Sequence, residues 1–234
     1  MQVTQLWCYP VKSMAGVRLD EARVGALGIE GDRQWGLVDL DTGLVLTARR
    51  VPELLFAEPV PGDGTMAVRL PDGTVAHDDA VLSEWLGRRV ALRRPAADER
   101  GRYEIAENDD RPDGAWIEWQ GPKGVWHDSN RTRLSVISED ALHDWDPRRF
   151  RANVYVAGGD ERDLVGRDIA IGDVTGSVVK EIDRCVIVTR PQPGLERDKS
   201  VLVRVHAERG GNLGVGVLVT GGGTIRVGDE VAAR

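Results

Sequence analysis

Short runs of alternating apolar and polar residues recur along most of the chain, and this alternation is the pattern of half-buried β-strands. The first run covers residues 3–9 and ends at Pro10, which cannot donate a strand hydrogen bond. Segments that contain Asp and Gly, such as 41–43 and 71–74, separate later runs and predict turns. The further strands predicted in the first half cover residues 18–24, 34–40, 44–48, 67–70, 75–77 and 88–94.

The second half repeats this strand pattern, and each half contains one predicted helix. Its predicted strands cover residues 133–137, 153–157, 168–171, 178–182, 186–189, 215–220 and 224–227. Helical spacing of apolar residues predicts one helix over residues 80–86 and another over 138–145. Acidic residues at 78–79 are suited to cap the first helix and Gly87 to end it, while Ser138 is suited to cap the second.

Residues 95–124 are rich in Ala, Asp, Glu, Gly, Pro and Arg, and this composition predicts a linker or mobile loop. Tryptophans at 116, 119 and 126 indicate that part of it docks, where it would shape or cover a pocket. Many short strands joined by turns are typical of barrels and sandwiches rather than of a parallel α/β sheet. We expect a mainly β protein of two β-barrel-like lobes with few short helices, divided into residues 1–97 and 98–234.

The balance of charge excludes several classes of partner. The 234 residues include 31 Lys or Arg and 38 Asp or Glu, a net charge of −7. Such a chain lacks the broad basic field of a nonspecific nucleic-acid or membrane-surface binder, so neither partner is expected. No run approaches the roughly 18 consecutive apolar residues of a membrane span, and the start does not resemble a signal peptide. We expect a cytoplasmic protein that acts on a small-molecule substrate.

The common catalytic motifs are absent, since HExxH, CxxC, the P-loop and GxSxG do not occur. The four histidines, at positions 77, 127, 143 and 206, are scattered, so each is expected to be a surface or partly buried residue. Two cysteines, Cys8 and Cys185, are too few for a disulfide framework, a four-cysteine zinc site or an internal iron–sulfur cluster. Any electron-transfer chemistry would therefore take its electrons from a separate protein.

Three clusters of residues are suited to chemistry. The sequence Tyr-Pro-Val-Lys-Ser at 9–13 ends a strand with a lysine and a hydroxyl in a turn, a combination that can hold a phosphate. A Gly-rich turn at 28–35 delivers Arg33 at the start of a strand. Arg184 and Cys185 are predicted to lie inside an apolar strand, where a cysteine is either a small buried hydrophobe or a thiolate favoured by the arginine.

Taken together, these clusters resemble the MOSC family, a molybdenum-cofactor-binding group that includes the mitochondrial amidoxime-reducing component. The resemblance covers nearly the whole chain, in the order that the family shows. The matching motifs are YPVKS at 9–13, GDR at 31–33 with Trp35, TARRVPEL at 47–54, LSVISEDAL at 134–142, RFRANV at 149–154, DRCVIVTR at 183–190 and GTIRVGDEV at 223–231. The ordered set is specific, although each motif alone is weak.

The resemblance implies a molybdenum-cofactor site with Cys185 as the metal ligand and the catalytic residue. A soft thiolate suits a molybdenum that two pterin dithiolene sulfurs already hold. The cofactor phosphate and pterin contacts that the family implies fall on Lys12, Ser13, Arg33, Ser138, Arg151 and Asn153. The implied reaction is reduction of N-hydroxylated or N-oxide-type compounds, and an association with pyridoxal phosphate binding also comes with the family.

One position departs from the family, and two alternative functions stay open. Animal members tend to have a serine two residues before the metal-binding cysteine, whereas this chain has Asp183. A carboxylate beside an anionic metal centre is unfavourable unless it is protonated or turned toward Arg184. A molybdenum-cofactor or sulfur carrier with a Cys185 persulfide is the first alternative. The second is a noncatalytic β-barrel adaptor in which Cys185 is a core residue.

Overall fold

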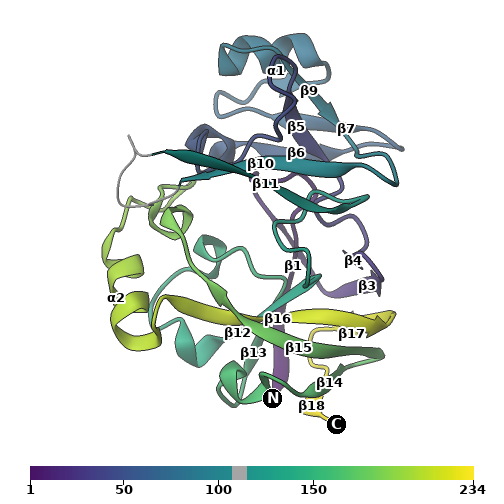
Figure 1. Cartoon of the computed structure of the whole chain (residues 1–234), viewed down its shortest axis with the longest axis vertical. Helices are drawn as coiled ribbons and strands as arrows, with labels where there is room; N and C mark the ends of the chain where they lie inside the picture. The colour runs from purple at the N-terminus through teal and green to yellow at the C-terminus, as the bar shows by residue number, and fades with distance from the viewer. Residues whose placement is uncertain (107–114) are drawn as a thin grey trace.

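The computed structural model describes residues 1–106 and 115–234, and these are mainly β (Figure 1). An eight-stranded curled sheet fills the lower half of the molecule in this view. Its strands, in spatial order, are β18 (Val231–Ala233), β14 (Asp168–Ile171), β15 (Val174–Asp183), β16 (Asn212–Gly221), β12 (Leu134–Ser138), β13 (Val154–Ala157), β1 (Gln2–Cys8) and β2 (Val17–Leu19). The predicted fold class is therefore confirmed.

Strand β1 joins the beginning of the chain to the sheet of the second half. It pairs antiparallel with β13, from Gln2 opposite Ala157 to Leu6 opposite Val154. Its apolar side chains enter one large core with residues of β12, β15 and β16. A second junction is made by β17 (Gly223–Arg226), which pairs with β3 (Glu21–Gly25), itself paired with β4 (Gly28–Ile29). The predicted boundary near residue 97 stays a prediction, and both lobes depend on these pairings.

The upper lobe has its own core and a well-capped helix. Helix α1 (Asp79–Leu86) shares this core with strands β5 (Gly36–Asp39), β7 (Met66–Arg69), β8 (Val75–Ala76) and β9 (Val90–Arg93) and with the short 3-10 helix η1 (Pro52–Phe56). Strand β6 (Glu58–Pro61) pairs with β7. The Asp78 carboxylate accepts hydrogen bonds from the Ala80 and Val81 amides, and Gly87 ends the helix at φ 61°. Both predicted caps are thus confirmed.

The stretch predicted as a loop contains a β-hairpin. Strands β10 (Arg100–Ala106) and β11 (Trp116–Lys123) pair antiparallel and lie between the two lobes in Figure 1. Tyr103 is buried and its ring packs 4.9 Å from that of Trp119. These aromatic contacts stabilise the hairpin, although charged residues on its other face conceal the strand pattern. Residues 107–114, also part of that prediction, lie outside the described residues.

Three further predictions of local structure are wrong. Residues 44–48 form one isolated bridge, Val38 to Val45, rather than a strand. Ser138 caps only the 3-10 helix η2 (Glu139–Ala141) instead of a helix through residue 145. The apolar run after Cys185 is the 3-10 helix η5 (Val186–Thr189), because it packs into a core with helix α2 (Ser200–Arg209) instead of joining a sheet. The sequence pattern misses α2, whose buried residues are Val201 and Val205 alone.

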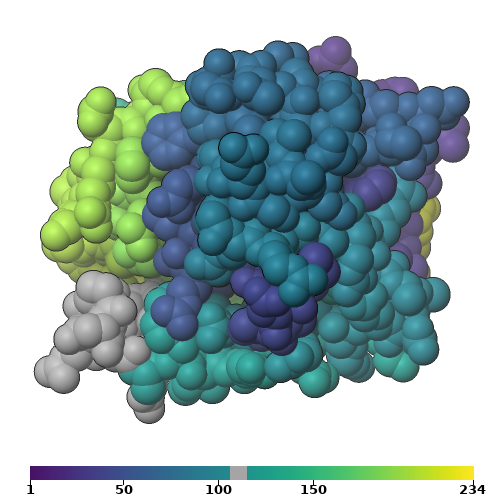
Figure 2. Space-filling view, turned by 90° about the horizontal axis from the view of Figure 1, so that it is seen from above, coloured from purple at the N-terminus to yellow at the C-terminus, as the bar shows by residue number. Residues whose placement is uncertain are grey.

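The remaining 3-10 helices are η3 (Pro147–Arg149) and η4 (Glu161–Leu164). In the view from above, residues of the upper lobe cover the centre of the molecule, and the yellow-green segment that includes α2 lies beside them (Figure 2). Within residues 1–106 and 115–234, no helix combines the length and apolar character needed to cross a bilayer.

A buried carboxylate connects four elements of the lower lobe. Glu161 is 0% exposed, and its two oxygens accept hydrogen bonds from the Ser138 and Gly214 amides, each at 3.1 Å. Arg209 at the end of α2 donates to the same carboxylate at 2.5 Å. A buried charge is stable only when it is paired and hydrogen-bonded in this way. Glu161 therefore fixes η4, α2, β12 and β16 relative to one another.

We expect Glu161→Ala to lower the free energy of unfolding by about 3 kcal/mol, because it leaves two buried amides without their acceptor and Arg209 with only its longer contact to Asp160. Urea denaturation followed by tryptophan fluorescence measures the change. Glu208→Ala is the matched control, since it removes a carboxylate that pairs with Arg204 on the exposed face of α2. It should leave the stability nearly unchanged. Equal effects of the two substitutions would contradict the role given to Glu161.

Candidate functional site

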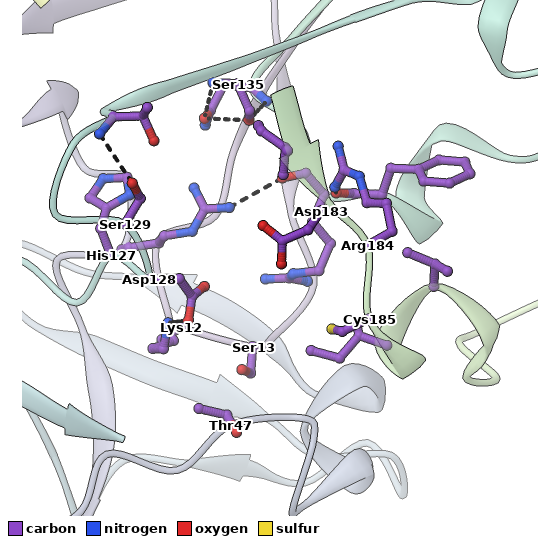
Figure 3. A pocket seen from close by; sticks show the side chains of 18 of the residues that line it. Lys12, Ser13, Thr47, His127, Asp128, Ser129, Ser135, Asp183, Arg184 and Cys185 are labelled. Carbon is purple, nitrogen blue, oxygen red and sulfur yellow. Dashed lines mark hydrogen bonds and ion pairs between the residues drawn. The ribbon is translucent and has the colours of Figure 1, made fainter. Parts of the chain in front are cut away.

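A cavity of about 540 Å³ lies between the lobes, and residues from distant parts of the chain line it. The lining comes from the turn after β1, the turn after β4, the segment 47–49, the hairpin β10–β11, the segment before β12, the segment before β13 and the end of β15. Figure 3 shows Lys12 and Asp128 on one side of this pocket and Asp183 and Cys185 on the other. The topology thus brings the three sequence clusters to one place.

Six of the seven predicted site residues line the cavity, namely Lys12, Ser13, Arg33, Arg151, Asn153 and Cys185. Ser138 does not. It is fully buried, its hydroxyl accepts the Asp140 amide, and its own amide donates to Glu161. Its place in the family motif is therefore explained by structure, since it caps η2 and joins the buried Glu161 network.

Three of the predicted residues have a strained backbone. Ser13, Arg33 and Arg151 have φ values of 67°, 50° and 54°, in the left-handed region that favours glycine. Among the described residues, His143 is the fourth non-glycine residue with a positive φ. Such strain costs about 1 kcal/mol or more per residue and persists only where neighbours fix it, often at functional sites. Three strained residues at one cavity indicate that the fold holds their side chains in particular directions there.

Tyr9 supports two of the lining arginines. The guanidinium groups of Arg33 and Arg151 lie over its ring, 5.0 Å and 4.4 Å from the centroid. Arg33 also pairs with the buried carboxylate of Asp32 and donates to the Arg151 carbonyl at 3.1 Å. Burial lowers the pKa of Arg151 to about 10, so this residue stays charged at neutral pH. The sequence includes Tyr9 in a motif, but nothing local to it reveals this supporting role.

Lys12 enters the cavity beside a carboxylate that the sequence analysis did not single out. Its ammonium donates to Asp128 Oδ1 at 2.8 Å and lies 4.5 Å from the centre of the Tyr103 ring. Burial lowers the pKa of Lys12 to about 8, against the opposing effect of Asp128. The Asp128 side chain is half exposed, but its position in the recess removes part of its hydration and so disfavours its charge; Lys12 and Arg49 outweigh this and hold the pKa of that carboxyl below its usual range.

His127 is fully enclosed, which corrects the expectation of a surface or partly buried residue. Its side chain is 8% exposed, and its Nε2 lies 3.7 Å from Asp32 Oδ2 without a hydrogen-bond partner among the residues described. Burial and the charge of Arg33 lower the pKa of His127 to about 3, so the ring is neutral at physiological pH. The only sequence signal was its place beside Asp128 in a polar segment ahead of an apolar strand.

Cys185 follows the end of β15 and precedes η5, so it does not lie within a strand as predicted. It is half-buried and lines the cavity, whereas Cys8 is buried in the large core, where burial raises its pKa to about 12. The Arg184 guanidinium turns away and donates to the carbonyls of Leu213 at 2.6 Å and Phe150 at 2.8 Å.

Gly214 makes room for this arrangement. It has a φ of 84°, and a Cβ there would come within 2.9 Å of a backbone oxygen and 3.0 Å of the Arg184 side chain. Asp183 does not turn toward Arg184. It is 81% exposed and lies 3.4 Å from the ammonium of Lys180.

The lining has the character expected of a site for an anionic, acceptor-rich ligand. Nine of its side chains are Lys or Arg, and its two carboxylates are Asp128 and Asp183. The Nη2 atoms of Arg151 and Arg184 are buried and have no hydrogen-bond acceptor within the described parts of the chain. Those same parts contain no cluster of three or more His, Cys, Asp or Glu able to hold a metal ion.

Two family profiles match the chain. The profile described as the MOSC N-terminal beta barrel domain matches residues 1–85, and that of the MOSC domain matches residues 126–232. The chain belongs to the MOSC family. The first MOSC segment supplies Lys12, Ser13 and Arg33, and the second supplies Arg151 and Cys185, so the cavity lies between the two family segments.

Relatives of known name extend this result. Mitochondrial amidoxime-reducing component 1 of Mus musculus is 26% identical over 280 residues, covering 98% of this chain and 81% of the relative. Molybdenum cofactor sulfurase of Drosophila persimilis is 22% identical over 259 residues, covering 94% of this chain. The chain spans only about a third of that sulfurase's length, 32%. Among solved structures, the YUAD protein of Bacillus subtilis has a TM-score of 0.48 at 18% identity, covering 98% of this chain and 93% of its own.

We expect Arg151→Gly to be more stable than Arg151→Ala by about 1 kcal/mol, because glycine adopts a positive φ without steric cost. Both variants lose the same guanidinium, so the difference between their free energies of unfolding reports the cost of the backbone conformation at φ 54°. Chemical denaturation of the two proteins side by side measures it. An alanine variant as stable as the glycine variant would show that the backbone at residue 151 is not strained.

The folded protein should lose stability through His127 as the pH falls from about 6.5 to about 3. In that window the unfolded chain binds a proton at this histidine and the folded chain does not, so acid favours unfolding. His127→Gln cannot titrate, and its free energy of unfolding should depend less steeply on pH. Urea denaturation of both proteins at several pH values tests this. Parallel curves would contradict a neutral, buried His127.

Proposed function

We propose that the cavity binds a molybdenum–pterin cofactor and that this MOSC protein is an oxidoreductase that reduces N-hydroxylated or N-oxide-type compounds. The observation that supports this most is the convergence of Lys12, Ser13, Arg33, Arg151 and Cys185, from four separate segments, on one cavity. The name of the mouse relative, an amidoxime-reducing component, supports the substrate class. Pyridoxal phosphate binding stays an untested expectation.

The cationic side of the cavity fits the phosphate of such a cofactor. A phosphate dianion is best held by a point charge, a hydroxyl and planar guanidinium donors together. Lys12 supplies the ammonium, Ser13 the hydroxyl, and Arg33 and Arg151 the guanidinium groups. The stacking on Tyr9 and the ion pair with Asp32 already fix the two arginines, so little side-chain entropy would be lost on binding. The Nη2 atom of Arg151, a cavity-lining residue, has no acceptor among the described residues and fits the acceptor-rich pterin.

The opposite side fits the metal. Cys185 would donate one soft thiolate ligand, and the cofactor's own sulfurs would donate others. When bound, the cofactor would supply a two-electron redox centre able to exchange oxygen with a substrate. Arg184 lies behind Cys185 and is fixed by two carbonyls, which keeps the adjoining backbone in place. The apolar side chains of Ile105, Trp119 and Ile187 line the same cavity and would exclude water from a small substrate. We further propose a separate electron-donor protein.

We expect wild-type protein from a cofactor-competent host to contain near-stoichiometric molybdenum and pterin, and Cys185→Ala to lose most of the metal, because its thiolate ligand is gone. Mass spectrometry measures the metal and fluorescence measures the pterin. Cys8→Ala is the matched control, since Cys8 is the other cysteine and does not line the cavity. It should keep both. Reduction of an N-hydroxylated amidine with an artificial electron donor should follow the metal content.

Two results would overturn this function. Full molybdenum occupancy and activity in Cys185→Ala would exclude Cys185 as the ligand. Absence of metal and pterin from wild-type protein, even after reconstitution, would exclude the cofactor. Sulfane sulfur on Cys185 after desulfurase treatment, without reductase turnover, would instead identify a sulfur carrier, an alternative to which the sulfurase relatives point.

A further inference from the structure

Asp128 is the carboxylate that occupies the cationic side of the cavity. Its Oδ1 atom lies 2.8 Å from the ammonium of Lys12 and 3.7 Å from Nη1 of Arg49. Lys12 and Arg49 belong to the first MOSC segment and Asp128 to the second, so these contacts join the two segments across the cavity. The Asp128 side chain is 50% exposed, whereas that of Lys12 is 3% exposed. The carboxylate thus faces both the ammonium and the open cavity.

The surroundings of Lys12 leave it dependent on this partner. Burial disfavours its charge most, and Arg33 and Arg49 act in the same direction, whereas the face of the Tyr103 ring attracts the ammonium. His127 lies on the same side of the pocket and is neutral. Asp128 favours a proton on Lys12 both by its charge and by its hydrogen bond. Without it, a buried amine next to two guanidinium groups would give up its proton more readily.

We infer that Asp128 is a positioning residue, an internal counter-ion that holds the Lys12 ammonium in the cavity and competes with the anion that this ammonium binds. The inference rests on the proposed function, in which that anion is the cofactor phosphate. An entering dianion must either displace the carboxylate from Lys12 or lie against it, and both weaken binding. Asp128 therefore makes the site selective for ligands whose other contacts overcome this competition.

Asp128 has two opposite effects on anion binding. It keeps Lys12 charged, which strengthens binding, and it competes with the anion for Lys12, which weakens binding. Measurements at different pH values separate the two effects. At low pH Lys12 is charged whether or not Asp128 is present, so Asp128→Asn removes only the competitor and should tighten anion binding. At higher pH the variant's Lys12 loses its proton earlier than the wild-type lysine, whose pKa is about 8, and the advantage should vanish. A residue with only a structural role would not produce this crossover.

The first measurement follows Lys12 itself. The chain has four lysines, at 12, 123, 180 and 199, so the side-chain nitrogens of protein labelled with ¹⁵N-lysine give few NMR signals, and Lys12→Gln identifies one of them. We expect Asp128→Asn to lower the pKa of Lys12 by at least about one unit. Asp183→Asn is the matched control, since it removes the other cavity carboxylate, which pairs with Lys180. It should leave the Lys12 signal unchanged.

The second measurement uses sulfate, a tetrahedral dianion whose own charge is constant over this pH range, with calorimetry on the full chain free of cofactor. At about pH 6.5 we expect Asp128→Asn to bind sulfate roughly tenfold more tightly than wild type, the effect of removing a nearby like charge. By about pH 8.5 this difference should disappear or reverse. In Asp183→Asn, the ratio of the sulfate affinities at the two pH values should equal that of the wild-type protein.

The outcomes separate this inference from the function on which it rests. An unchanged Lys12 pKa in Asp128→Asn, or equal shifts in both Asn variants, would overturn the counter-ion role. A second outcome is that Asp128→Asn shifts the Lys12 pKa, but neither Lys12→Gln nor Asp128→Asn alters sulfate binding. This would confirm that Asp128 holds the charge on Lys12 and show that the anion does not bind at Lys12. That result would contradict the proposed phosphate position and the competition alike.

Discussion

The buried carboxylate of Asp32 holds together the two turns from which much of the proposed site arises. It accepts the Tyr9 amide at 2.7 Å and pairs with Arg33, so the end of β1 and the turn after β4 are fixed to each other. Tyr9 in turn supports Arg33 and Arg151 on its ring, which extends this constraint to the segment before β13. Burying an anion costs several kcal/mol unless such partners surround it. Loss of Asp32 would therefore release all three segments together.

This constraint explains how strained residues can persist beside the cavity. A positive φ at Ser13, Arg33 and Arg151 would relax in a free turn, but each residue has tertiary contacts that fix its direction. The Ser13 hydroxyl accepts the Ala48 amide at 3.0 Å, and Arg151 donates to the Met14 carbonyl at 2.6 Å. The lobes thus stabilise a backbone that local sequence disfavours. Strain of this kind is consistent with a pocket that is shaped before its ligand arrives.

Local pattern predicts strand β1 and helix α1 well, because alternation and capping residues act within a few positions of each other. It fails at Val186–Thr189, where packing against α2 replaces a strand by a 3-10 helix, and at the hairpin β10–β11. The order of the motifs identifies most of the site. It does not distinguish a serine that faces the cavity, such as Ser13, from Ser138, whose amide donates to the buried Glu161. Asp128 escapes notice because its partner Lys12 lies 116 positions away, and a single sequence contains no such pairing.

The net charge of −7 and the cationic cavity together favour a particular kind of anion. A polyanion must approach the negative exterior over a wide area, where repulsion acts on every charge. A small anion can enter the recess, where low-dielectric walls strengthen the field of the lining arginines. Within the recess, Asp128 opposes ligands that contact Lys12 alone. The same distribution of charge that disfavours a polyanion therefore suits the ligand we propose, one phosphate joined to a larger hydrogen-bonding group.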